Sequence, residues 1–349
     1  MRVVVVGAGL GGLCVANALH AAGWDVEVLE AQNKIRDERQ GYRININPSG
    51  HDALRTCLND EQFAAYERLL HRQPDAAVYL YSSTLDLLAR YETPGPPGAI
   101  DRTRMRSLLA DRVADRITFD RRIESINQVG PADLIVVADG VGSALRQELI
   151  PGHDPQPLGS SAIFGRTAIT EANRGWLAPV ILRSRFCGVV DTDTTLALCA
   201  YDAPHAPAPY VMWVLIGPTS ELPTARADLL DFARNRTADW DPRATAVLRE
   251  TTADDCFATP LRAMPEVPPL PTPTGVPVAF LGDAIHAMSP AGGEGANTAF
   301  ADAALLVRAV RSGGPIDQAV AQYHEQMRAM AGEALRRSAN YGPKVAPHA

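Results

Sequence analysis

Lysine, paired cysteines and uninterrupted apolar runs are all scarce in this chain. Lys34 and Lys344 are the only lysines, so arginine supplies almost all of the basic residues. The formal net charge is −7, and an acidic balance argues against a nucleic-acid partner. The cysteines number five, an odd count, and none stands at C-x-x-C spacing. We therefore expect a cytoplasmic protein without disulfides.

Signs of a metal centre, a catalytic triad or a membrane anchor are also missing. No His, Cys or carboxylate grouping has metal-site spacing. The apolar run over residues 3–19 is interrupted by four glycines. A strand, a glycine turn and a helix explain it better than a secretory signal or a membrane span does. Hydrophobic residues make up 46% of the 349 residues, enough for a sizeable core in a globular α/β protein.

The N-terminus carries a dinucleotide-binding fingerprint. Residues 3–6 are four valines, typical of a strand buried on both faces of a parallel sheet. A G-x-G-x-x-G motif follows at Gly7, Gly9 and Gly12, where glycines permit a tight turn, a close pyrophosphate and close helix packing. Glu30 lies 18 residues beyond Gly12, at the end of the next expected strand. A carboxylate there accepts from the adenosine ribose and favours FAD or NAD over NADP.

Hydrophobic periodicity predicts the remaining elements. Residues 134–138 and 278–281 indicate buried parallel strands, which end at Asp139 and Asp283. Alternation between residues 160 and 216 predicts a mostly antiparallel sheet. Its expected strands cover residues 162–170, 195–201 and 210–216. Helices are expected at residues 103–113, 224–238, 242–250 and 315–340, and a proline-rich crossover loop at 265–277.

This order predicts a fold of two parts. Residues 1–155 and 266–349 would form a discontinuous, Rossmann-like FAD-binding domain. Residues 156–265 would form an inserted substrate domain, to which residues of about 40–100 also contribute.

The longest motif occupies residues 282–306, GDAIHAMSPAGGEGANTAFADAALL. It resembles the G-D-A-x-H-x-x-x-P-x-x-G-x-G-x-N-x-A-x-x-D-A-x-x-L signature of the single-component (class A) FAD-dependent monooxygenases, the para-hydroxybenzoate hydroxylase family. Residues 133–146 and 101–109 are similar to two further motifs of that family, A-D-L-x-x-x-A-D-G-x-x-S-x-x-R and D-R-x-x-L-R-x-x-L. The chain looks most like the short members, which include tetracycline-inactivating enzymes and urate, kynurenine and salicylate hydroxylases.

The resemblance implies FAD as cofactor and NAD(P)H as reductant. In the family, O₂ adds to the reduced flavin as a C4a-hydroperoxide, which oxygenates an electron-rich substrate. Hydroxylation, epoxidation or Baeyer–Villiger oxidation of an aromatic or polyketide-like molecule is expected. A flavin-dependent reductase or dehydrogenase and a non-catalytic flavin-binding protein remain alternatives. The sequence does not choose between NADH and NADPH, name the substrate, or give the oligomeric state.

Fingerprint and resemblance together imply a set of cofactor-binding residues. Asp283 would accept from a ribityl hydroxyl, Arg102 would meet the pyrophosphate, and the helix starting near Gly295 would direct its positive end at the flavin. His286 is expected to be buried and structural. The full set is Gly7, Gly9, Gly12, Glu30, Arg102, Asp139, Asp283, Pro290, Gly293, Gly295, Ala296 and Asn297.

Substrate-contacting residues are less constrained by the sequence. Arg43, Tyr210, Met212 and Trp213 are candidates for contacts with substrate or NAD(P)H, but core packing or a surface ion pair explains each as well. Glu294 stands where relatives often have Gln, and it would add a negative charge near the flavin.

Overall fold

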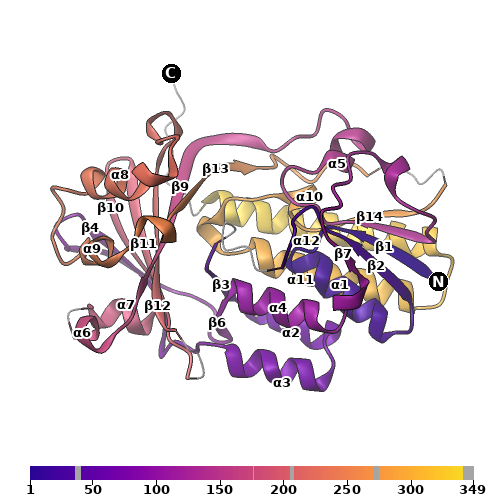
Figure 1. Cartoon of the computed structure of the whole chain (residues 1–349), viewed down its shortest axis with the longest axis horizontal. Helices are drawn as coiled ribbons and strands as arrows, with labels where there is room; N and C mark the ends of the chain where they lie inside the picture. Colours follow the sequence, from indigo (N-terminus) through magenta and orange to yellow (C-terminus); the bar gives the residue numbers. More distant parts are fainter. Residues whose placement is uncertain (36–40, 176, 205–207, 271–274, 341–349) are drawn as a thin grey trace.

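The computed structural model describes residues 1–35, 41–175, 177–204, 208–270 and 275–340. The molecule is built around two large β-sheets, one of five strands and one of seven (Figure 1). The strands are β1 (Arg2–Val6), β2 (Asp25–Leu29), β3 (Arg43–Ile46), β4 (Asp75–Ser82), β5 (Leu87–Glu92), β6 (Gly98–Asp101), β7 (Ile117–Thr118), β8 (Leu134–Val137), β9 (Gln156–Ala168), β10 (Ser184–Asp191), β11 (Thr194–Tyr201), β12 (Tyr210–Pro218), β13 (Phe257–Ala263) and β14 (Val278–Phe280). The α-helices are α1 (Leu10–Ala21), α2 (Pro48–Cys57), α3 (Asp60–Leu69), α4 (Arg102–Asp111), α5 (Ala144–Leu149), α6 (Glu171–Arg174), α7 (Pro179–Arg183), α8 (Leu229–Arg236), α9 (Ala246–Glu250), α10 (Asp283–His286), α11 (Gly295–Arg311) and α12 (Ile316–Asn340).

The five-stranded sheet is parallel throughout, in the order β14-β8-β1-β2-β7. The four valines of β1 are at most 3% exposed, as expected for a central strand covered on both faces. Helices α1, α11 and α12 pack together beside this sheet, at the right of Figure 1. The Rossmann-like arrangement predicted from the fingerprint is therefore confirmed.

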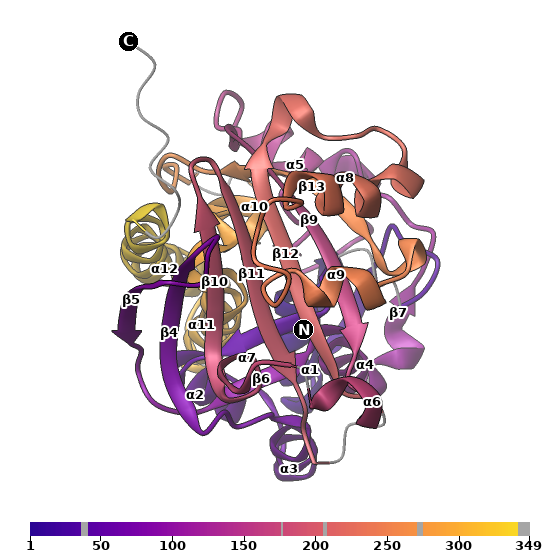
Figure 2. The same ribbon diagram turned by 90° about the vertical axis from the view of Figure 1, so that its left-hand side faces the viewer.

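The seven-stranded sheet has the order β13-β9-β12-β11-β10-β4-β5, and all of its pairs are antiparallel except β10 with β4. Its outer face is covered by α7, α8 and α9 (Figure 2). Strands β3 and β6 pair with each other as a separate antiparallel ribbon. The inner face of the seven-stranded sheet lies toward this ribbon, as shown by the hydroxyl of Tyr210 on β12, which lies 2.9 Å from the backbone oxygen of Tyr42, the residue before β3. The mostly antiparallel sheet is confirmed, although four of its strands, β4, β5, β10 and β13, were not predicted.

Helix α12 was predicted almost to the residue. Val320, Tyr323 and Met327 recur at helical spacing and are fully buried. The hydroxyl of Tyr323 donates to the carbonyl of Phe280 at 2.7 Å, which fixes α12 against β14. Among the helices that the structure describes, none combines the length and the apolar content needed to cross a bilayer. Residues 271–274 of the predicted crossover loop lie outside the described residues.

Candidate functional site

The glycine turn between β1 and α1 has the sterics that its motif requires. Gly7 has φ +107°, and a Cβ there would lie 2.3 Å from the carbonyl oxygen of Ala138, the residue that follows β8. A Cβ on Gly12 would lie 2.0 Å from the oxygen of Gly7. At Gly9 the nearest atom to such a Cβ is 4.0 Å away. Gly7 and Gly12 thus serve close packing, while Gly9 leaves space beside the uncapped N-terminus of α1.

Glu30 and Arg106 form a buried ion pair beneath this turn. Oε2 of Glu30 accepts from the N–H of Ala8 at 2.8 Å and from Nη2 of Arg106 at 3.1 Å, and Oε1 accepts from the N–H of Gln32 at 2.8 Å. Arg106 also donates to Ala8 O at 2.7 Å, to Gln32 Oε1 at 2.7 Å and to Ile35 O at 2.9 Å. The two side chains therefore fix the dinucleotide turn to α4. Sequence reasoning missed Arg106, although it is the second arginine of the D-R-x-x-L-R motif.

Three strand ends meet at the carboxyl edge of the parallel sheet. Gly7 follows β1, Asp139 follows β8, and Asp283 follows β14. In open α/β sheets, ligands bind at this edge. Oδ1 of Asp139 is buried without a hydrogen-bond partner, and burial raises the pKa of this carboxyl group. Asp283 is exposed.

Arg102 begins α4 close to this edge. Burial lowers the pKa of its guanidinium, and the negative charge of Asp283 partly opposes that shift. The structure thus brings Arg102 into the electrostatic range of Asp283, although the two are 181 residues apart in the chain. This convergence supports the expectation that both residues face one ligand.

The loop before α11 presents its backbone rather than side chains. Pro290 opens a short 3₁₀ turn, and Gly293 closes it with φ +64°. A Cβ on Gly293 would meet nothing closer than Asn45 at 4.0 Å. At Gly295, the first residue of α11, the nearest atom would be Oδ1 of Asp283 at 3.8 Å. The loop and the helix N-terminus could therefore accept a flat ring laid against them.

Asn297 requires a correction as a direct cofactor ligand. Its side-chain amide donates to the carbonyl oxygens of Asn45 at 2.8 Å and Gly293 at 3.0 Å, and its oxygen accepts from the N–H of Asn47 at 3.0 Å. Both N–H donors of the amide are thus used within the protein, and the residue is 2% exposed. The side chain ties the loop to β3, and only the backbone around Ala296 and Asn297 remains for a ligand.

His286 is fully buried, as expected. Its Nε2 lies 2.6 Å from Oδ2 of Asp302, which also accepts from the N–H of Gly282 at 2.9 Å. Burial favours the neutral ring, but the Asp302 carboxylate outweighs that effect and raises the pKa of His286. This pair joins α10 to α11 and has a structural role.

The extra negative charge of Glu294 is balanced locally. Its two carboxylate oxygens accept from Nε and Nη2 of Arg337 on α12, at 3.3 and 3.4 Å. The expected change in the field at the flavin is therefore reduced by a neighbouring cation.

The four candidate substrate residues do not share one pocket. Tyr210 and Met212 lie on the inner face of the seven-stranded sheet, and Arg43 reaches the same side from β3. Trp213 lies on the outer face, fully buried, with its indole N–H donating to Thr251 at 2.8 Å. Successive strand residues point to opposite faces, so Trp213 cannot join Tyr210 and Met212 around one ligand. We withdraw it as a substrate contact.

The hydroxyl group of Tyr210 is also engaged in hydrogen bonds within the protein. Its hydroxyl lies 2.9 Å from Oδ2 of Asp101, the N-cap of α4. The contact links the inner sheet face to the helix that carries Arg102. Met212 and Arg43 therefore remain the better candidates for touching a substrate.

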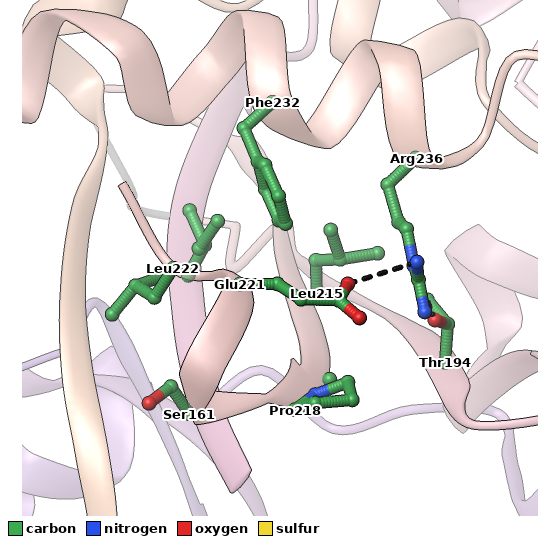
Figure 3. Close-up of a pocket in the computed structure, with 10 residues that line it drawn as sticks. Ser161, Thr194, Leu215, Pro218, Glu221, Leu222, Phe232 and Arg236 are labelled. Atoms are coloured by element: carbon green, nitrogen blue, oxygen red, sulfur yellow. Dashed lines mark hydrogen bonds and ion pairs between the residues drawn. The ribbon is translucent and has the colours of Figure 1, made fainter. Parts of the chain in front are cut away.

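A small depression on the outer face is separate from these residues. It is lined by Leu215, Leu222 and Phe232 and is bordered by the ion pair of Arg236 with Glu221 at 2.9 Å (Figure 3). Because the sequence motifs belong to the part of the chain around the parallel sheet, we assign this depression no function. Within the described residues, no three His, Cys, Asp or Glu side chains gather as a metal ion would need, and each of the five cysteines is a free thiol.

Comparison with known proteins identifies the family. Residues 274–338 match the family described as FAD binding domain, and residues 5–55 match NAD(P)-binding Rossmann-like domain. The crystal structure of a candidate FAD containing monooxygenase from Photorhabdus luminescens is 30% identical, with a TM-score of 0.81 and coverage of 98% of both chains. The chain belongs to the FAD-dependent monooxygenases.

Curated relatives include other FAD-dependent monooxygenases. Phenazine 1,6-dicarboxylic acid hydroxylase PhzS of Lysobacter antibioticus is 29% identical over 92% of this chain and 85% of its own length. The dual O-methyltransferase/FAD-dependent monooxygenase CTB3 of Cercospora beticola is 27% identical over 96% of this chain. This chain spans 40–45% of the length of the first curated relatives that it matches.

Proposed function

We propose that this chain binds FAD and uses NAD(P)H and O₂ to insert one oxygen atom into an electron-rich aromatic or polyketide-like small molecule. In the overall balance, substrate, O₂, NAD(P)H and a proton give the oxygenated product, water and NAD(P)⁺. The observation that carries the proposal is the convergence of two half-sites. The glycine turn after β1 and the Gly293–Gly295 loop open toward the carboxyl edge of one parallel sheet.

The residues of the edge fit FAD in their chemistry. The N-terminus of α1 and the guanidinium of Arg102 suit a pyrophosphate. Glu30 suits the adenosine ribose, and Asp283 suits a ribityl hydroxyl. Asp139, with a buried carboxylate oxygen that has no partner, supports the view that a polar ligand completes this cleft. Bound FAD would supply the electron transfer and oxygen activation.

The protein's own contribution would be orientation and exclusion of water. The α11 N-terminus would stabilise negative charge on the ring edge that faces it. The inner face of the seven-stranded sheet, with Met212 and its apolar neighbours, would close the far side of the substrate. The division into a discontinuous FAD-binding domain at residues 1–155 and 266–349 and a substrate domain at 156–265 belongs to this proposal.

The substrate class and the compartment also rest on inference. Relatives named for urate and for phenazine 1,6-dicarboxylic acid support a heteroaromatic or aromatic substrate. The requirement for NAD(P)H favours the cytoplasm, where that reductant is regenerated.

Isotope labelling tests the proposal. The FAD-loaded protein is screened with NADH and NADPH against phenolic and polyketide-like compounds for reductant consumption and peroxide release. The compound that most accelerates reductant consumption is then turned over under ¹⁸O₂. We expect one ¹⁸O atom in the product by mass spectrometry. A substrate that turns over without label, and equally well without oxygen, would establish a reductase instead.

A further inference from the structure

Two arginines are buried where the β3–β6 ribbon meets the seven-stranded sheet. Arg43 on β3 is 8% exposed, and Arg185 on β10 is 7% exposed. Nη2 of Arg43 donates to the carbonyl oxygen of Arg185 at 3.2 Å. The Arg43 side chain therefore spans the junction and reaches the strand that carries the second arginine.

Neither guanidinium has a counter-ion within the part of the chain that the structure describes. Among the described residues, no carboxylate lies within 4.0 Å of either side chain, and Nε of each is buried without a hydrogen-bond partner. Asp101 is opposite Arg43 across the ribbon. Its carboxylate oxygens instead accept from the N–H of Arg104 at 2.9 Å and the hydroxyl of Tyr210 at 2.9 Å.

Across residues 1–35, 41–175, 177–204, 208–270 and 275–340, the acceptors that contact the two guanidiniums are all neutral. With its amide oriented to satisfy the network, Gln73 accepts from Arg43 at 2.8 Å, and Asn45 accepts from Arg185 at 3.2 Å. Burial and the charge of Arg43 lower the pKa of Arg185, and the same two causes lower the pKa of His71 nearby. Buried charges normally occur paired, because desolvation is costly. The unpaired guanidiniums thus make this junction strongly electropositive.

The arginine pair lies next to the loop proposed to carry the flavin ring. Arg43 and Asn45 point to the same face of β3, since they are two residues apart in a strand. The carbonyl of Asn45 accepts from Asn297, and its Cβ is the closest atom to a Cβ placed on Gly293. Asn45 therefore stands between Arg185 and the Gly293 loop.

We propose that Arg43 and Arg185 form an anion-binding subsite, and that the substrate binds there as an organic anion. Its carboxylate or ionised enol would lie between the two guanidiniums, with the rest of the molecule extending toward the Gly293 loop. The planar donor fork of arginine matches such oxygens closely. The identification of this anion as the substrate rests on the proposed oxygenation, whereas the binding itself does not.

Calorimetric titration of the FAD-loaded protein with matched probes tests the subsite. The carboxylate 3-hydroxy-2-naphthoate is compared with its neutral amide, and ionised 2-hydroxy-1,4-naphthoquinone is compared with its 2-methoxy ether. We expect the wild type to prefer the anion in at least one pair. Arg43→Met and Arg185→Met should each weaken that anion on the order of 10- to 100-fold and leave the neutral partner unchanged.

Arg236→Met is the matched control, because it removes the same charge from α8, a helix that covers the outer face of the same sheet. It should retain the preference. If a methionine variant does not fold, Arg43→Lys and Arg185→Lys keep the charge without the fork and should show an intermediate loss. Equal affinity of the wild type for both members of each pair, no binding of either anion at millimolar concentration, or an unchanged preference in both arginine variants would overturn the subsite.

These outcomes are independent of oxygenation. Calorimetry needs no turnover, so the proposed function can fail in the ¹⁸O₂ experiment while the anion subsite stands, and the reverse is equally possible.

Discussion

Replacement of Arg106 by Met should cost a large part of the stability of the FAD-free protein. The guanidinium donates to the Glu30 carboxylate, to Ala8 O, to the Gln32 side chain and to Ile35 O, and the Arg106 side chain is 3% exposed. Methionine keeps most of the apolar stem but satisfies none of these acceptors. At about 1 kcal/mol for each lost bond, the sum is about 4 kcal/mol, within the range of about 3–5 kcal/mol for breaking a buried ion pair.

Equilibrium urea unfolding followed by tryptophan fluorescence measures this loss. Arg112→Met is the control, because Arg112 follows α4 and is exposed; it should change the free energy of unfolding by less than about 0.5 kcal/mol. Glu30→Gln and the double variant complete a cycle, in which the two losses should be less than additive. A loss below about 1 kcal/mol for Arg106→Met, or full additivity, would refute the argument that the pair fixes the dinucleotide turn.

Three further predictions concern separate parts of the molecule. Burial lowers the pKa of His324 to about 4, below the value of about 6.5 in the unfolded chain. The folded state is therefore fully stable above a pH of about 6.5, and about 3 kcal/mol of its free energy of unfolding is lost as the pH falls from about 6.5 toward 4. In urea melts, His324→Gln, which can still accept from the N–H of Phe280, should flatten this pH dependence, and an unchanged slope would contradict the argument. Trp213→Phe should lower the free energy of unfolding by about 1–3 kcal/mol through loss of the bond to Thr251 and of packing, yet leave probe affinity as in the wild type; weaker probe binding would show that the outer face matters. Asp283→Ala should weaken FAD binding by about 1–3 kcal/mol in equilibrium dialysis with unchanged circular dichroism, and wild-type affinity would mean that Asp283 does not contact the cofactor.

The sequence predicted best the elements whose pattern has a single structural explanation. The four valines of β1 form an unbroken β-branched run, which indicates a strand buried on both faces. The apolar residues of α12 recur at helical spacing, which indicates an amphipathic helix. Strand β5 forms the edge of the sheet, with Leu87, Leu88 and Tyr91 more than half exposed, and β4 lies next to it. Their apolar residues follow no clear alternation, and β4 is fixed by pairing with β10, about 100 residues later. Such pairing leaves no local signal.

The hydrogen-bond partners and the orientations of individual side chains in the site were the least predictable from the sequence. Asn297 belongs to the motif, but the sequence does not reveal that its amide is used by Asn45 and Gly293. Trp213 is different, because the period of two along a strand already separates it from Met212, and its assignment to the pocket overlooked that rule. The buried pair of Arg43 and Arg185 could not be foreseen, since β3 and β10 meet only in the folded chain.

The strand order of the parallel sheet has a consequence for how the protein is made. β1 is synthesised first, but β14, which completes the same sheet beyond β8, follows about 270 residues later. At roughly 5–20 residues per second, the ribosome needs about 14–55 s to supply it. The glycine turn after β1 thus emerges long before the Gly293 loop and α12 exist. Nascent chains should hold an incomplete sheet edge during this interval, when chaperones can bind it, and stable flavin loading should wait until the Gly293 loop and α12 have emerged.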